Sequence, residues 1–184
     1  MSDTSIVIPD SLFEIASSAQ FEGSFVVGSL SLGADVYEFP EPVSWQATIS
    51  NTGESLAVLG RVTGEGTCAC ARCLEPITFD FEGDIEGYAF LQEPTEEELE
   101  GFEVDEYVVL AEDEKILDME PLIRAALCLD APLVPLCKDD CAGLCPTCGA
   151  NLNEGPCDCV ADPDEEAAFS KNPFAVLKDL QLDD

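Results

Sequence analysis

A chain of 184 residues of which 46% are hydrophobic can form an ordinary domain with a core, which excludes disorder throughout. Its 39 Asp and Glu outnumber seven scattered Lys and Arg, which gives a formal net charge of −32. The electric field of such a chain repels phosphate, and the sequence shows no basic patch for binding nucleic acid. A cationic protein is therefore the expected partner, and an acidic surface that only confers solubility is the alternative.

The chain begins without a basic segment followed by an apolar stretch, and its longest mostly apolar run, 125–137, is broken by an aspartate and two prolines. We therefore expect neither a signal peptide nor a membrane span. Ten cysteines in such a chain are expected to be metal ligands, because the cytosol keeps unbound thiols reduced. The expected location is the cytoplasm.

The first half of the chain, to about Phe90, has the pattern of β-strands. Apolar and polar residues alternate through 43–50, which is typical of a strand with one buried face, and 51–53 predicts a turn. Residues 56–62 and the alternating stretch 77–82 predict two further strands, and the short connections favour antiparallel pairing. Less regular strand signals lie at 5–8 and 25–32.

The segment 93–120 carries thirteen acidic residues and one base, Lys115, so self-repulsion is expected to keep much of it extended or mobile, with a strand at 107–110. Asp118 then predicts a helix cap. Leu122, Ile123, Ala126 and Leu127 fall on one face of a short core helix that ends before Pro132. We expect Cys128 to be a small buried hydrophobe rather than a ligand.

The end of the chain predicts a linker followed by a helix. Residues 162–166 form an acidic linker, and NPFAVLKDL from Asn172 has a capping asparagine, a proline at the first helical position, and Phe174, Leu177 and Leu180 on one face. We expect this amphipathic helix to dock on its own domain, with an exposed partner site as the alternative.

The run from Cys137 to Cys159 carries the strongest local signal. Cys145 and Cys148, followed by Gly149, form a zinc knuckle, because two intervening residues let both sulfurs reach one ion while the glycine relieves crowding. Cys157 and Cys159 close a short loop and are expected to complete the tetrahedron. A chain without histidine and with four thiolates on one ion leaves no open position for a substrate, so we predict structural zinc.

The choice of ligands stays open at this point, because Cys137 and Cys141 precede the knuckle and either can displace Cys157 or Cys159. A further pair, Cys70 and Cys73, lies where the chain turns between two predicted strands. One hypothesis is a second four-sulfur site of Cys70, Cys73, Cys137 and Cys141, which would tie the later part of the chain to the sheet. Cys68 fits no metal-binding pattern.

Enzyme chemistry is not indicated by any motif. A dithiol redox centre needs a helix start to lower the pKa of its first sulfur, and the residues after Cys73 lead into a strand instead. Iron–sulfur ligation is the other alternative for these cysteines. The sequence contains no phosphate-binding glycine loop, nucleophile elbow or histidine-based triad, so we expect no catalytic residues and no small-molecule substrate.

Three segments together resemble the YceD family: CARCLEPI from Cys70, GLCPTCGANLNEGPCDC from Gly143, and NPFAVLKDL from Asn172. The family is named for a requirement in the accumulation of large-subunit ribosomal RNA, and its genes often neighbour that of a small basic ribosomal protein. The resemblance implies a role in ribosome biogenesis and implies no catalytic residues. Some members lack the late cysteines, so zinc is expected to be a subgroup feature.

Together these observations predict an α+β fold: an antiparallel sheet, with a barrel as one alternative, a short packing helix, a zinc-binding lobe and a C-terminal helix. The expected divisions are a mainly β domain at 1–136 with an acidic insert at 93–120, a cysteine-rich lobe at 137–160, and the linker and helix at 161–184. The expected function is non-enzymatic binding of a basic ribosomal protein. The alternatives are direct rRNA binding or processing, and a general zinc-ribbon interaction module.

Overall fold

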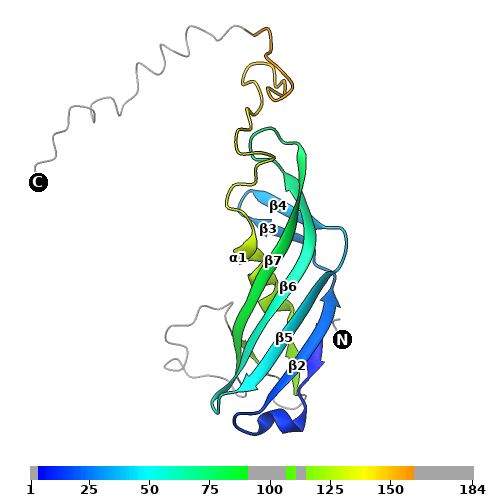
Figure 1. The fold of residues 1–184 in the computed structure, drawn as a ribbon, viewed down its shortest axis with the longest axis vertical. Helices are drawn as coiled ribbons and strands as arrows, with labels where there is room; N and C mark the ends of the chain where they lie inside the picture. Colours follow the sequence, from blue (N-terminus) through cyan, green and yellow to red (C-terminus); the bar gives the residue numbers. More distant parts are fainter. Residues whose placement is uncertain (1–3, 91–106, 111–114, 160–184) are drawn as a thin grey trace, which may run out of the picture.

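The computed structural model describes residues 4–90, 107–110 and 115–159, and the statements below concern these residues. They form a long twisted sheet with one helix, and a cysteine-rich segment extends beyond one end of the sheet (Figure 1). The predicted linker and C-terminal helix, and most of the acidic insert, lie outside the described residues.

In chain order the elements are β1 (Ser5–Val7), the 3-10 helix η1 (Asp10–Phe13), β2 (Ser18–Phe25), β3 (Gly28–Leu32), β4 (Asp35–Phe39), β5 (Val43–Asn51), β6 (Ser55–Ala69), β7 (Pro76–Phe90), β8 (Tyr107–Val109), β9 (Ile116–Asp118) and α1 (Glu120–Asp130). The strands expected at 5–8, 43–50 and 107–110 are thus present, with small differences in length. The stretch 25–32 is not one strand: β2 ends at Phe25, and the chain turns before β3 at Gly28, whose φ is +71°.

The main sheet is open rather than barrel-shaped over the described residues. β2, β5, β6 and β7 follow one another in antiparallel order, and β8 adds to β7 in parallel. β5 pairs with β6 only as far as Thr63, and β4 meets the remainder of β6 at Thr67. Because β6 is longer than β5, both β5 and β4 pair along the same edge of β6, and the outer strands do not meet to close a barrel.

β6 and β7 form the spine of the molecule, and each is longer than the sequence pattern indicated. They pair without a break from Ser55 opposite Phe90 to Ala69 opposite Pro76. The glycines within them allow close packing and do not end the strands: a Cβ on Gly83 would lie 2.6 Å from the carbonyl oxygen of Ala126. The hairpin therefore reaches well past the rest of the sheet and carries its turn, residues 70–75, to the cysteine-rich segment.

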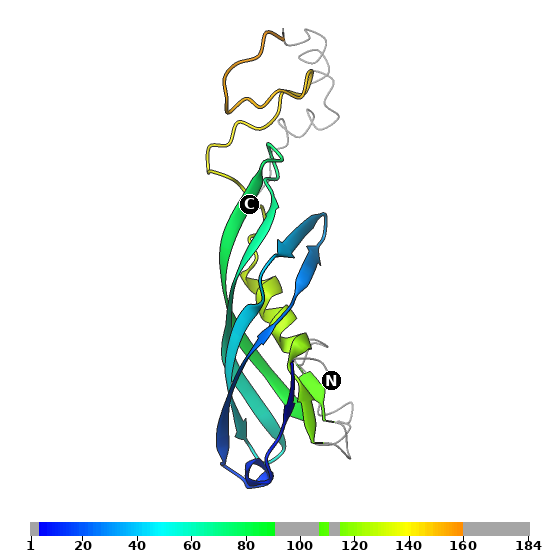
Figure 2. The ribbon, with the colours of Figure 1, turned by 90° about the vertical axis from the view of Figure 1, so that its right-hand side faces the viewer.

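The single α-helix of the described residues lies along one face of the sheet (Figure 2). Its predicted core residues, Leu122, Ile123, Ala126 and Leu127, are all buried. Met119 directly precedes the helix and makes no side-chain cap, so the predicted capping residue lies one position earlier. Asp118 nevertheless accepts a 3.0 Å hydrogen bond from the Glu120 amide, because β9 ends immediately beside the first helical turn.

The core lies between this helix and the sheet. Tyr37 and Phe81 are fully buried and meet edge to face with ring centroids 5.8 Å apart. The Tyr37 hydroxyl donates a 3.1 Å hydrogen bond to the Pro132 carbonyl, which fixes the chain where it leaves α1 for the cysteine-rich segment. Cys128 is half-buried and packs against this core.

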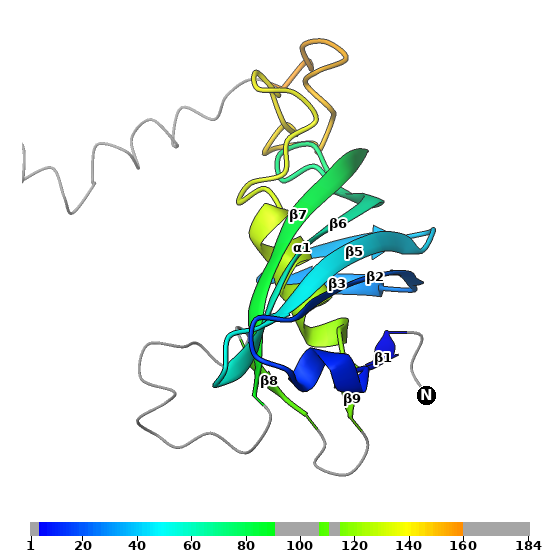
Figure 3. The same cartoon turned by 60° about the horizontal axis from the view of Figure 1, so that its bottom comes forward.

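β1 and β9 form a separate two-stranded antiparallel sheet at the end of the molecule opposite the cysteine-rich segment (Figure 3). A mostly antiparallel main sheet with a packed helix corresponds to the expected α+β class. Over the same residues, no helix has the length and apolar content needed to cross a membrane.

Candidate metal centres

Two groups of four cysteines lie in the segment beyond the sheet. We call Cys70, Cys73, Cys137 and Cys141 the hairpin cluster, and Cys145, Cys148, Cys157 and Cys159 the knuckle cluster. Within each group all four sulfurs lie within 4.8 Å of one another. All ten cysteines fall within the described residues, and no disulfide joins any of them.

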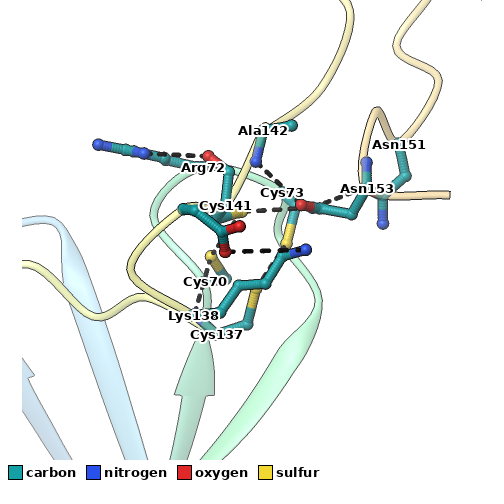
Figure 4. A network of polar contacts seen from close by, with 10 residues as sticks. Cys70, Arg72, Cys73, Cys137, Lys138, Cys141, Ala142, Asn151 and Asn153 are labelled. Carbon is teal, nitrogen blue, oxygen red and sulfur yellow. Dashed lines mark hydrogen bonds and ion pairs between the residues drawn. The ribbon is translucent and has the colours of Figure 1, made fainter. Parts of the chain in front are cut away.

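The hairpin cluster takes one pair of cysteines from the turn between β6 and β7. The Cys70 amide donates to the Glu75 carbonyl at 2.8 Å, and the Leu74 amide donates to the Cys70 carbonyl at 2.9 Å, so the turn folds tightly on itself. Leu74 has a φ of +61°, an uncommon conformation for leucine. This tight turn directs Cys70 and Cys73 toward the same side (Figure 4).

The second pair comes from the chain after α1. The Ala71 amide donates to the Pro135 carbonyl at 2.8 Å, and Arg72 donates to the Cys141 carbonyl at 3.0 Å. These two bonds dock the 135–141 segment against the hairpin turn. Cys137 and Cys141 thereby reach Cys70 and Cys73, although more than 60 residues separate them along the chain.

The sulfur–sulfur distances in the hairpin cluster suit tetrahedral coordination of one ion. The sulfurs of Cys70 and Cys141 are 3.8 Å apart, and those of Cys73 and Cys137 are 3.6 Å apart. A zinc–sulfur bond of about 2.3 Å places two sulfurs of a tetrahedron about 3.8 Å apart. Cys70, Cys73 and Cys141 are buried, and Ile77, Leu136 and Leu144 pack around them.

The thiols of this cluster differ in how readily they ionise. The pKa of Cys70 is lowered to about 6, first by the hydrogen bond from the Cys73 amide. The side-chain amide of Asn153 lowers the pKa of Cys141, whereas burial raises the pKa of Cys137 to about 12. Four adjacent sulfurs cannot all carry a negative charge without a cation, so a metal ion is the species that would let all four act as thiolates.

The knuckle cluster is built locally. The Cys145 amide donates to the Ala150 carbonyl and the Gly149 amide donates to the Cys145 carbonyl, both at 2.8 Å. Gly149 has a φ of +73°, a left-handed conformation that glycine adopts without steric cost. Leu144 then bridges to Asn151, and the chain returns to supply Cys157 and Cys159.

The thiols of the knuckle cluster also differ in how readily they ionise, and more of them are exposed to solvent than in the hairpin cluster. Hydrogen bonds from the amides of Cys148 and Thr147 lower the pKa of Cys145 to about 6. The pKa of Cys159 is raised to about 12, first by its hydrogen bond with Cys148. Cys145 is buried, while Cys148 and Cys159 are exposed.

The structure therefore groups the sulfurs as the two-site hypothesis does, with Cys157 and Cys159 beside the knuckle pair and Cys137 and Cys141 beside the hairpin pair. Cys68 lies outside both clusters on the buried face of β6, where burial raises its pKa. Within the described residues, neither the pair Cys70 and Cys73 nor the pair Cys145 and Cys148 stands at the start of a helix. Each cluster offers four sulfurs as potential ligands. Each cluster can hold a metal ion, and four thiolates on one tetrahedral ion would leave no open coordination position.

Sequence reasoning missed one residue of the site. The sequence analysis did not single out Asn153, yet its Nδ2 lies 3.3 Å from the Cys141 sulfur. The only sequence signal was the pair of asparagines at 151 and 153, which is also typical of an ordinary turn.

Comparison with known proteins gives a family for the chain. Residues 58–181, about two thirds of the chain, match the family described as Large ribosomal RNA subunit accumulation protein YceD, and this range includes both clusters. An uncharacterized protein of Mycobacterium tuberculosis and one of Mycobacterium bovis are each 33% identical over 109 residues, covering 59% of this chain and 50% of the relative. An uncharacterized protein of Mycobacterium leprae is 28% identical over 122 residues, covering 64% of this chain and 52% of the relative. The chain thus spans about half the length of the curated relatives that it matches. No solved structure matches it.

Proposed function

The chain belongs to the YceD family of large ribosomal RNA subunit accumulation proteins, and from this premise we propose that it is a non-enzymatic, cytoplasmic factor for large-subunit rRNA accumulation. The family match carries this proposal. The two all-sulfur clusters support its non-enzymatic part, since neither presents an open position where a substrate can bind.

Each cluster, in this proposal, holds one structural zinc ion. The sulfur separations of 3.6 and 3.8 Å in the hairpin cluster support zinc coordination, and the chain has no histidine to form a mixed site. Zinc in the hairpin cluster would stabilise the contact between the hairpin turn and the segment after α1. Zinc in the knuckle cluster would order the loop that follows.

A basic ribosomal protein is the proposed partner, and the outer face of the β6–β7 hairpin is the acidic surface that favours it. Five exposed carboxylates lie on this face and form what we call the acidic ribbon: Glu65, Asp80, Glu82, Asp84 and Glu86. Glu65 lies directly opposite Asp80 in the strand register. Like charges in that position destabilise a sheet, and a bound cationic partner would relieve the repulsion.

Direct binding to RNA is less well supported, because the basic side chains of the described residues already contact acceptors. Arg61 contacts Asp84, Arg72 the Cys141 carbonyl, Lys115 Asp10, Arg124 Glu120, and Lys138 Asp140. A phosphate group would have to replace these oxygens within a field of the same sign as its own. The acidic ribbon presents no such obstacle to a cationic protein.

Depletion of the protein in cells tests the function. We expect a fall in the ratio of large-subunit to small-subunit rRNA, restored by the wild-type chain. A variant that replaces four carboxylates of the acidic ribbon, Asp80→Asn, Glu82→Gln, Asp84→Asn and Glu86→Gln, should fail to restore it. A control with the same change in charge, Glu14→Gln, Glu22→Gln, Glu41→Gln and Glu54→Gln, should restore it. An unchanged rRNA ratio on depletion would contradict the proposed function.

Copurification tests the partner separately. A basic ribosomal protein should copurify at low salt and be lost steeply as ionic strength rises, because exposed charge pairs are screened. Retention that does not depend on salt would contradict the electrostatic mechanism. A gel shift of rRNA fragments by the purified protein alone would favour direct RNA binding instead.

A further inference from the structure

Asn153 belongs to the loop of one cluster, but its side chain contacts the other. It lies between Cys148 and Cys157, within the loop whose two ends are ligands of the knuckle cluster. Its Nδ2 donates to the sulfur of Cys141, a member of the hairpin cluster, at 3.3 Å (Figure 4). It is thus a direct polar link between a residue inside the knuckle loop and a sulfur of the hairpin cluster.

The orientation of the Asn153 amide is determined by its other contacts. Its Oδ1 accepts the Ala142 amide at 2.9 Å, and its Nδ2 also donates to Asn151 Oδ1 at 2.9 Å. Exchanging the oxygen and nitrogen of the side chain would set donor against donor at Ala142 and acceptor against acceptor at Asn151. The nitrogen therefore faces Cys141.

The position of Asn153 depends on the knuckle loop being closed. The Leu152 amide donates to the Gly143 carbonyl at 2.9 Å, and the Glu154 amide donates to the Asn151 carbonyl at 3.2 Å. These short-range bonds shape the loop, but its two ends are brought together at Cys148 and Cys157. Loss of an ion from the knuckle cluster would release both ends of the segment that carries Asn153.

We propose that Asn153 couples metal binding at the two clusters, so that an ion in the knuckle cluster strengthens binding in the hairpin cluster. Hydrogen bonds to a metal ligand typically change metal affinity by about 10- to 100-fold. Coupling between binding sites is reciprocal, so an ion in the hairpin cluster strengthens binding in the knuckle cluster by the same factor. This inference rests on the proposed function only in requiring that both clusters bind metal.

Cadmium-113 NMR of the full chain can follow the two sites separately, because each four-sulfur site should give its own resonance. The Cys148→Ser variant assigns them, since it removes the knuckle resonance. Titration with a chelator then gives one midpoint for each site. In the wild-type protein we expect the hairpin cluster to retain cadmium at about tenfold more chelator than in Cys148→Ser.

Substitution of Asn153 tests its part in the coupling. Asn153→Ala should lower the hairpin midpoint by about tenfold, and adding Cys148→Ser should lower it little further, because both changes remove the same contact. Asn153→Asp keeps an acceptor for the Ala142 amide but loses the donor to sulfur. It should therefore weaken the hairpin site at least as much as Asn153→Ala, which a purely structural role in the loop would not do. The neighbouring exposed substitution Glu154→Gln is the matched control and should leave both midpoints unchanged.

The outcomes separate this inference from the proposed function. Two resonances whose chelator midpoints are the same in wild type, Asn153→Ala and Asn153→Asp would overturn the coupling while leaving two metal sites in place. A wild-type chain with no cadmium resonance would overturn the metal sites themselves, and the coupling with them.

Discussion

The two clusters each bring four sulfurs together, but in different structural settings. The hairpin cluster joins a turn of the sheet to a segment more than 60 residues later and is largely buried, whereas the knuckle cluster lies within fifteen residues and is largely exposed. A long closed loop carries more conformational entropy than a short one, so an ion in the hairpin cluster constrains the chain more. We therefore expect metal in the hairpin cluster to stabilise the whole protein, and metal in the knuckle cluster to order only the loop around it.

Cys73→Ser should have the largest effect. Losing one ligand of the hairpin cluster removes its ion. At a free zinc concentration 1,000 times the Kd of the site, a bound ion contributes about 4 kcal/mol to stability. For a chain of this size we expect the Tm of the zinc-loaded protein to fall by roughly 10 °C. Circular dichroism melting measures it.

Amide exchange and a control variant sharpen this prediction. The Ala71 amide, which donates to the Pro135 carbonyl, should lose its protection in Cys73→Ser as the docked segment loosens. Cys128→Ser, which changes a cysteine outside both clusters, should keep this protection. A Tm equal to that of the wild type would show that the hairpin cluster does not hold the two segments together.

Cys148→Ser should have a smaller effect on the whole protein. Residues of the knuckle loop should lose amide protection, while the sheet should be destabilised only through the tenfold weaker hairpin site, or about 1.4 kcal/mol. Melting and amide exchange of the zinc-loaded protein measure both effects. A fall in Tm as large as that of Cys73→Ser would remove the distinction between the clusters.

Tyr37→Phe should have the smallest effect at neutral pH, about 1 kcal/mol for the lost hydrogen bond to the Pro132 carbonyl. Its effect on pH dependence is more specific. Burial raises the pKa of Tyr37 to about 12 from 10.0, so the folded state favours the neutral phenol. The stabilisation is complete below pH 10 and is lost as pH rises toward 12, with a slope of about 1.4 kcal/mol per pH unit.

Denaturant unfolding at several alkaline pH values measures that slope, which Tyr37→Phe should flatten. Tyr88→Phe, at a more exposed position of β7, should keep it. An identical slope in wild type and Tyr37→Phe would mean that another group controls the alkaline stability of the sheet.

The sequence alone predicted local features better than long-range ones. Cys145, Cys148 and Gly149 define a knuckle within a few residues, so its geometry follows from spacing and a required left-handed glycine. The partners of Cys70 and Cys73 depend instead on where α1 delivers the chain, and on the bond between Ala71 and Pro135. The spacing of the cysteines along the sequence indicates neither the path of the chain after α1 nor this hydrogen bond. For that reason two assignments of the ligands remained open.

Strand lengths were underestimated for a related reason. Glycines at 64, 66 and 83 weaken the alternating pattern of β6 and β7, but they occupy places where neighbouring atoms leave no room for a side chain. That crowding exists only once β5, α1 and the hairpin are packed together. The role of Asn153 likewise appears only when the knuckle loop lies beside Cys141.

Zinc analysis of the purified chain tests the central claim most directly. The account predicts two zinc ions per wild-type chain, one per chain in Cys73→Ser and one in Cys148→Ser, each lost on treatment with strong chelator together with the amide protection of its own cluster. A single ion in the wild type would contradict the two-site account. A chain with no ion whose cysteine-rich segment keeps its amide protection in chelator would contradict metal binding altogether.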